Sequence, residues 1–90
     1  MDELEKLRME IDKIDDEIME IISKRMNIVR EIAKLKKNRT DSVQDKKREE
    51  EIYRRIIQKA TMLRIDAEDA KRIFHDILES SRKLQKEMIK

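Results

Sequence analysis

The chain has 90 residues, of which 49% are charged and 38% hydrophobic, and its formal net charge is only +2. It contains no cysteine, glycine, proline or tryptophan and a single histidine. This composition excludes disulfides, thiolate sites, cysteine nucleophiles, multi-histidine metal sites and the glycine-dependent phosphate-binding loops. No apolar run reaches the ~20 residues of a membrane span, so we expect a soluble, cytoplasmic protein with one domain over residues 1–90. The near balance of charge argues against a nucleic-acid-binding arm.

The first third of the chain predicts one long helix over roughly residues 3 to 37. Apolar residues recur there with alternating spacings of three and four, the repeat of a helix that packs along a narrow seam. At ~1.5 Å per residue such a helix is about 50 Å long. A 90-residue chain cannot cover it, so we infer a second chain. The repeat consists of Leu4, Leu7, Ile11, Ile14, Ile18, Ile21, Ile28, Ile32 and Leu35.

Residues 38–44 break the repeat and are rich in residues that favour turns and caps. Asp41 or Ser42 is predicted to cap a second helix, with Asp45 in its first turn. The second apolar stripe runs through Ile52, Tyr53, Ile56, Ile57, Ala60 and Leu63.

A weaker break at residues 63–65 precedes a third helix, for which Asp66 is the predicted cap and Asp69 completes a motif like a capping box. The fold class is therefore all-α, with a three-helix subunit (long, short, medium) in an intertwined helical homodimer. The third stripe runs through Ala70, Ile73, Phe74, Ile77, Leu78, Leu84 and Met88.

Three basic residues of the first helix are candidates for a site. Arg25 occupies the seam position skipped between Ile21 and Ile28, where a guanidinium needs an anionic partner; a register-setting or snorkelling role, or an ion pair to a neighbouring helix, is the structural alternative. Lys36, eleven residues on, returns to within about 20° of the same face. Arg8 is about 25 Å before Arg25, so it can approach that site only from an antiparallel second chain. Taken singly, Lys36 and Arg8 are ordinary solvated residues.

The other two helices also carry polar groups on their apolar stripes. Asp45, Arg48 and Glu49 share a face with the stripe of the second helix, although an Asp45–Arg48 salt bridge within the helix is an alternative. Ser81 interrupts the third stripe and Gln85 follows one turn later. Together these groups predict a polar cavity for an anionic, oxygen-rich ligand.

Segments spread along the chain, in that family's order, resemble the all-helical class of chorismate mutases. The run from Leu7 to Asp15 and the segments Ser23-Lys24-Arg25 and Ile32 to Lys36 resemble that family's first helix. Asp45 to Glu49 resembles the entry to its second helix, and Ser81 to Gln85 its closing motif. The resemblance covers almost the whole chain.

The resemblance implies an intertwined homodimer with two active sites that rearranges chorismate to prephenate in the biosynthesis of phenylalanine and tyrosine. It implies no metal, cofactor or covalent intermediate. Arg25, Arg48, Ser81 and, from the opposite chain, Arg8 would bind the substrate carboxylates. Lys36 and Gln85 would donate hydrogen bonds to the ether oxygen, and Glu49 with the backbone of Asp45 would hold the ring hydroxyl.

Further expectations concern two residues outside the site, the origin of the chain and the alternative functions. His75 is predicted to lie at the surface and Tyr53 at the edge of the core, both outside the site. The absence of glycine and proline indicates a designed, library-selected or simplified member of the family, with a thermophilic natural enzyme as the alternative. A non-catalytic helical oligomerisation or interaction module is the alternative function, and a basic nucleic-acid binder the third.

Overall fold

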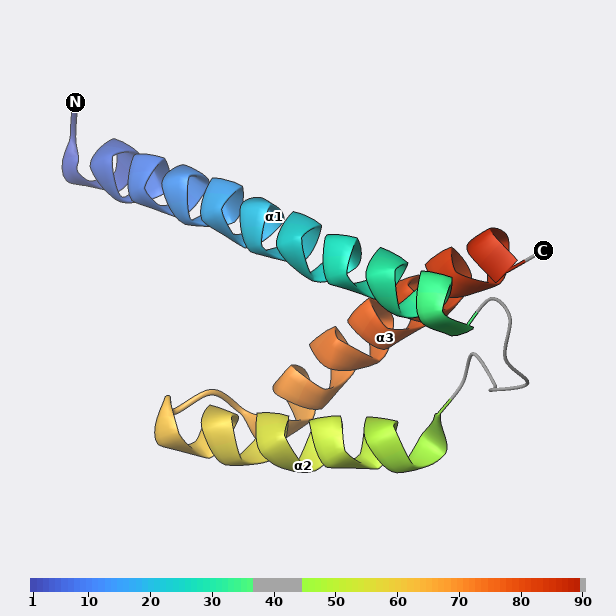
Figure 1. Ribbon diagram of the computed structural model, residues 1–90. Coiled ribbons are helices and arrows are strands. Elements are labelled where there is room, and N and C mark those ends of the chain that lie inside the picture. Colours follow the sequence, from blue (N-terminus) through green and yellow to red (C-terminus); the bar gives the residue numbers. More distant parts are fainter. Residues whose placement is uncertain (37–44, 90) are drawn as a thin grey trace.

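The computed structural model describes residues 1–36 and 45–89, and these form three α-helices (Figure 1). Helix α1 spans Glu3–Lys36, α2 spans Lys46–Met62 and α3 spans Ala67–Ile89. The all-α fold and the predicted order of a long, a short and a medium helix are confirmed. The described residues contain no helix long and apolar enough to cross a membrane.

An aspartate side chain supports the start of each helix by accepting a hydrogen bond from a backbone N–H group three residues on. Asp2 accepts from Glu5 at 2.8 Å, and Asp66 accepts from Asp69 at 2.9 Å, as the sequence predicted for α3. For α2 the predicted cap was wrong. Its N-cap is Asp45, whose extended backbone (φ −109°, ψ 94°) directs the carboxylate to the N–H group of Arg48 at 3.0 Å. Residues 41 and 42, the predicted caps, lie outside the described residues.

The turn between α2 and α3 closes without glycine. Arg64 has a left-handed backbone with φ of 59°. The N–H group of Ile65 donates to the carbonyl of Ala60 at 2.8 Å, and that of Arg64 donates to Thr61 at 3.3 Å. This pair of bonds is the Schellman motif, which satisfies carbonyl groups left unpaired at the end of a helix. Arg64 therefore occupies a position that glycine usually fills.

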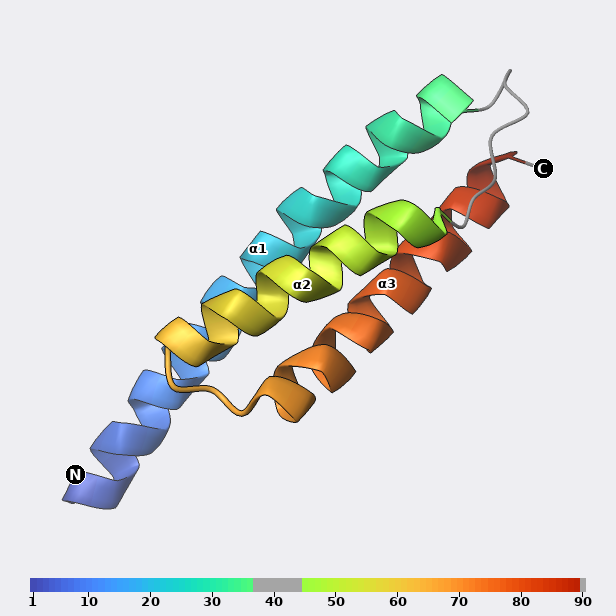
Figure 2. The same ribbon diagram turned by 90° about the horizontal axis from the view of Figure 1, so that it is seen from below.

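Helix α3 is the centre of the fold because α1 and α2 each pack against it. Figure 1 shows α3 crossing the C-terminal part of α1, and Figure 2 shows α2 alongside α3. On α1 the buried residues are Val29 and Ala33, which lie one turn apart with half-buried Met26 and Ile22 on the preceding turns. This contact face is therefore a second stripe, next to the seam predicted from the sequence. The buried apolar residues of α2 and α3 are Ile52, Ala60, Ala70 and Leu78.

The predicted seam of α1 is exposed in the single chain. Its nine apolar residues, from Leu4 to Leu35, retain between 40% and 71% of their accessible surface. The N-terminal half of α1 projects past the other two helices in both views (Figures 1 and 2). The radius of gyration is 16.5 Å, compared with about 12 Å for a compact domain of this length. The chain thus has a small core and a long uncovered apolar stripe.

Leu63 and Ile73, which the sequence placed on the inner stripes of α2 and α3, are 57% and 54% exposed. They border an apolar groove of about 270 Å³ beside the α2–α3 turn, together with Ile65 and Phe74. In the single chain no part of α1 lines this groove, which is why these side chains remain accessible.

Candidate functional site

A cavity of about 250 Å³ lies where the C-terminal part of α1, the start of α2 and the C-terminal part of α3 meet. Seven of the eight predicted site residues line it, and the eighth, Arg8, does not. The apolar part of the wall comes from the stripes that pack the three helices together. The lining residues are Arg25, Val29, Ile32, Lys36, Asp45, Arg48, Glu49, Ile52, Leu78, Ser81, Arg82 and Gln85.

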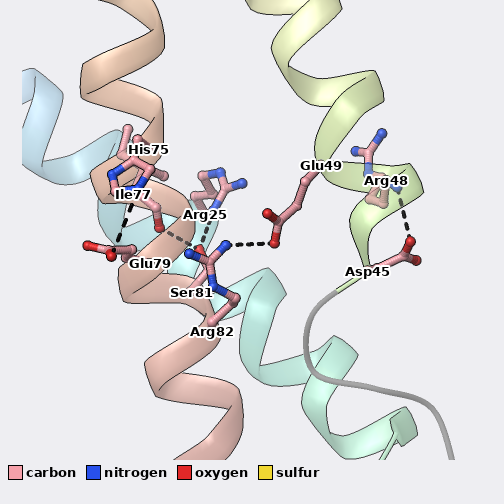
Figure 3. A network of polar contacts seen from close by, with 9 residues as sticks. All are labelled: Arg25, Asp45, Arg48, Glu49, His75, Ile77, Glu79, Ser81 and Arg82. Atoms are coloured by element: carbon pink, nitrogen blue, oxygen red, sulfur yellow. Dashed lines mark hydrogen bonds and ion pairs between the residues drawn. The ribbon is translucent and has the colours of Figure 1, made fainter.

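Arg25 and Ser81 join α1 to α3 on the floor of the cavity (Figure 3). The Nη1 atom of Arg25 donates to Ser81 Oγ at 2.6 Å, and Ser81 Oγ donates to the carbonyl oxygen of Ile77 at 2.9 Å. Burial, followed by the positive charges of Arg48 and Arg55, lowers the pKa of Arg25. Arg25 therefore holds its charge in a partly desolvated and electropositive place, which an anion would stabilise.

The start of α2 brings two more polar side chains to the cavity. The Asp45 carboxylate caps the helix, and the Arg48 guanidinium points away from that carboxylate (Figure 3). Nη1 of Arg48 lies 3.6 Å from Glu51 Oε2, and both side chains are about half exposed. The link between Asp45 and Arg48 is therefore a helix cap rather than the side-chain salt bridge considered as an alternative. Arg48 remains a surface cation at the rim.

Glu49 pairs across the cavity with Arg82, a residue that the sequence analysis did not select. Arg82 Nη1 donates to Glu49 Oε2 at 2.7 Å, and the two side chains are 21% and 18% exposed. The bond links α3 to α2 (Figure 3). Arg82 follows Leu78 by four residues and precedes Gln85 by three, so helical periodicity alone places it on this face.

Gln85 lies near the C-terminal end of α3, and Lys36 lies at the C-terminal end of α1. Gln85 is 8% exposed, and its Oε1 atom is buried without a hydrogen-bond partner among the described residues. A buried amide oxygen left unpaired costs about 1–3 kcal/mol, so this atom calls for a ligand or water in the cavity. Lys36 is half-buried on the last turn of α1 and lines the same cavity.

Two residues considered from the sequence lie elsewhere. Arg8 is exposed on the projecting part of α1, about 25 Å along the helix from Arg25. His75 is exposed on α3, as predicted, with its ring nitrogens 3.4 Å from Asp76 Oδ1 and 3.9 Å from Glu79 Oε1. Neither belongs to the cavity of this chain.

The electrostatic character of the cavity is positive. Four cationic side chains and two carboxylates line it, which leaves an excess of two positive charges. Of these cations, Arg82 is neutralised by Glu49 within the cavity. The cationic side chains of the cavity, the hydroxyl of Ser81 and the amide of Gln85 together suit a small anionic ligand.

Comparison with known proteins gives matches to one family. Residues 7–86 match the family model described as chorismate mutase type II. A chorismate mutase of Methanocaldococcus jannaschii is 28% identical over 89 residues, which cover 99% of this chain and 90% of the relative. A bifunctional chorismate mutase/prephenate dehydratase of Aquifex aeolicus is 34% identical over 58 residues, 64% of this chain and 16% of that protein. No solved structure matches the chain significantly.

Proposed function

The chain belongs to the chorismate mutase type II family, and we propose that the cavity between its three helices is where it rearranges chorismate to prephenate. The observation that carries this proposal is the meeting of seven predicted site residues around one cavity, although they are spread over 61 positions of the chain, from residue 25 to residue 85. The excess positive charge of the cavity suits a substrate with two carboxylates.

Substrate binding rests on the cationic residues and Ser81. Arg25 binds one carboxylate with its guanidinium. The O–H group of Ser81, which donates to the carbonyl of Ile77 in the free protein, turns to the same carboxylate when the anion binds. Arg48 reaches from the rim toward the carboxylates. The anion replaces the solvent that Arg25 has lost through burial, which supports tight binding of a dianion.

Catalysis in this proposal is electrostatic. The ether C–O bond breaks while a new C–C bond forms, and negative charge grows on the ether oxygen without proton transfer to the protein. Lys36 donates a hydrogen bond to that oxygen, and the Gln85 amide donates a second. The two ends of an amide exchange by rotation about the last side-chain bond, so the unpaired buried end of Gln85 supports this role. Glu49 and the backbone of Asp45 hold the ring hydroxyl. Donors fixed before reaction cost no reorganisation at the transition state.

The proposed enzyme is an intertwined homodimer in which Arg8 enters the site of the other chain. The nine exposed apolar residues along α1 support this assembly. The single chain exposes 7704 Å², roughly 2,000 Å² more than a compact monomer of 11 kDa. An excess of that size corresponds to the surface that stable homodimers bury. Antiparallel pairing of two α1 helices brings Arg8 toward the opposite Arg25 and Lys36.

The test is chorismate disappearance, followed by ultraviolet absorbance, with the parent protein and two lysine variants. Lys36→Ala removes a donor to the ether oxygen, so we expect kcat to fall about 10²–10³-fold. Lys34→Ala is the matched control, because Lys34 is 64% exposed on the same helical turn and pairs with Glu31 at 3.3 Å. We expect the control to keep the parent's activity.

Circular dichroism establishes equal helical content for the three proteins before rates are compared. A well-folded parent that shows no rate above the spontaneous reaction would refute the proposed activity. It would favour the alternative of a helical oligomerisation or interaction module, for which the exposed α1 stripe also provides a surface.

A further inference from the structure

The ion pair between Glu49 and Arg82 differs from the surface ion pairs of this chain. It joins α2 to α3 across the cavity at 2.7 Å, with both side chains about four-fifths buried. By comparison, the Arg72–Asp69 pair has a similar length of 2.9 Å but lies one turn apart on α3, with side chains 70% and 53% exposed. Exposed pairs of the second kind contribute little to stability, whereas a mostly buried contact between helices fixes the position of both groups.

We propose that Arg82 is a positioning residue that holds the Glu49 carboxylate in place for the ring hydroxyl of the substrate. This inference rests on the proposed function. Arg82 engages one carboxylate oxygen, Oε2. A carboxylate has two oxygens and about four lone-pair sites, so Glu49 retains the capacity to accept a hydrogen bond from a ligand. Arg82 thus orders a flexible side chain before the substrate arrives.

The charge of Arg82 has a second consequence for the same contact. The proposed substrate carries two carboxylates, and an uncompensated Glu49 in the cavity wall would repel it. The guanidinium of Arg82 offsets the Glu49 charge at hydrogen-bond distance. Glu49 can therefore accept a hydrogen bond from a hydroxyl beside an anionic substrate at a smaller electrostatic cost than a lone carboxylate in this position.

A direct role for Arg82 in binding a substrate carboxylate predicts a different result from a role through Glu49. If Arg82 acts through Glu49, its loss affects only substrates that possess the ring hydroxyl. If Arg82 binds a carboxylate, its loss affects every substrate that possesses the carboxylates. Chorismate and its analogue with hydrogen in place of the ring hydroxyl separate the two cases.

The experiment measures kcat and KM for both compounds with the parent, Arg82→Met, Arg82→Lys and Glu49→Gln, and with the double variant Arg82→Met/Glu49→Gln. Arg72→Met is the matched control, since it removes an arginine of α3 whose ion pair lies outside the cavity. For Arg82→Met we expect kcat/KM to fall about 10- to 100-fold with chorismate, and to change about twofold or less with the deoxy analogue. Arg82→Lys should recover part of the loss.

The double variant should be no slower than Glu49→Gln alone, because both changes remove the same contact. Equal losses on the two compounds, or losses that multiply in the double variant, would overturn the role of Arg82 while leaving the proposed function intact. An inactive, folded parent would overturn the proposed function and this inference with it. If Arg82→Met loses helical content, Arg82→Ala gives the same comparison with the residue of highest helix propensity.

Discussion

The exposed stripe of α1 allows the proposed homodimer to be tested by one substitution near its middle. Ile14 is 49% exposed in the single chain. Full burial of an isoleucine stabilises by about 1.5–3 kcal/mol, so covering the exposed half contributes about 1 kcal/mol per chain and about 2 kcal/mol in a two-fold dimer. Ile14→Glu removes that contribution and adds the cost of burying a carboxylate in each chain, several kcal/mol per ion. We therefore expect the dimer Kd to rise at least about 10³-fold.

Sedimentation velocity over a wide concentration range measures the change in Kd, and chorismate turnover is followed in the same samples. Because Arg8 would enter the site from the partner chain, activity should fall in proportion to the dimer fraction. Met19→Glu is the control. Met19 is also on α1 and is 64% exposed, but it lies five positions from Ile14 and so about 140° around the helix.

The reasoning would be refuted if Ile14→Glu kept the mass and the activity of the parent. Equal weakening by Ile14→Glu and Met19→Glu would also contradict it, since a general effect of charge on helix α1 would then account for both. If Ile14→Glu dissociated the dimer without loss of activity, the site would not depend on the dimer, and the proposed role of Arg8 would be refuted.

Three further predictions follow from single residues. Since the pKa of Arg25 is lowered, first by burial and then by Arg48 and Arg55, its charged form destabilises the fold at every pH below its folded pKa. Arg25→Met should thus be at least as stable to urea at neutral pH while kcat/KM falls about 100-fold or more; a clear loss of stability would contradict this. Arg64→Gly relieves the left-handed residue at φ 59° and should stabilise by about 0.5–1 kcal/mol, raising Tm in a thermal melt, whereas Arg64→Ala should not. His75→Gln should leave the pH profile of turnover unchanged, because His75 is exposed outside the cavity; a lost step near neutral pH would argue otherwise.

The helices follow from the sequence because their apolar periodicity and their caps are local signals. Asp66 was found in this way, since it stands alone before an apolar stripe and accepts from Asp69 as predicted. The cap of α2 was misplaced because three capping residues, Asp41, Ser42 and Asp45, occur within five positions. Propensity does not distinguish between them, and the backbone at Asp45 decides.

The residues that line the cavity could be selected from the sequence much better than the hydrogen bonds and ion pairs between them. Arg25 and Ser81 interrupt apolar stripes, so both were selected, but nothing in the sequence says that they bond to each other. Arg82 was missed although helical periodicity places it on the face of Leu78 and Gln85, because one arginine among 23 basic residues does not stand out until its partner is known. The alternative pairing of Asp45 with Arg48 was reasonable at a spacing of three, yet the backbone N–H group of Arg48 is what Asp45 binds. In a chain with 49% charged residues, many pairings satisfy the spacing rules and tertiary packing selects among them.

The placement of the cavity entirely on helices and one N-cap has a consequence for changes in chain length. Inserting one residue between Arg25 and Lys36 would turn everything beyond it by about 100° and move it by 1.5 Å, which carries Lys36 off the face it shares with Arg25. The same holds between Ser81 and Gln85, where a single deletion turns the Gln85 amide by about 100° away from the face that it shares with Ser81. A site carried by loops could absorb such changes, but this one cannot. The intervals 25–36 and 81–85 should therefore accept substitutions at their exposed positions and no insertions or deletions in any active protein built on this architecture.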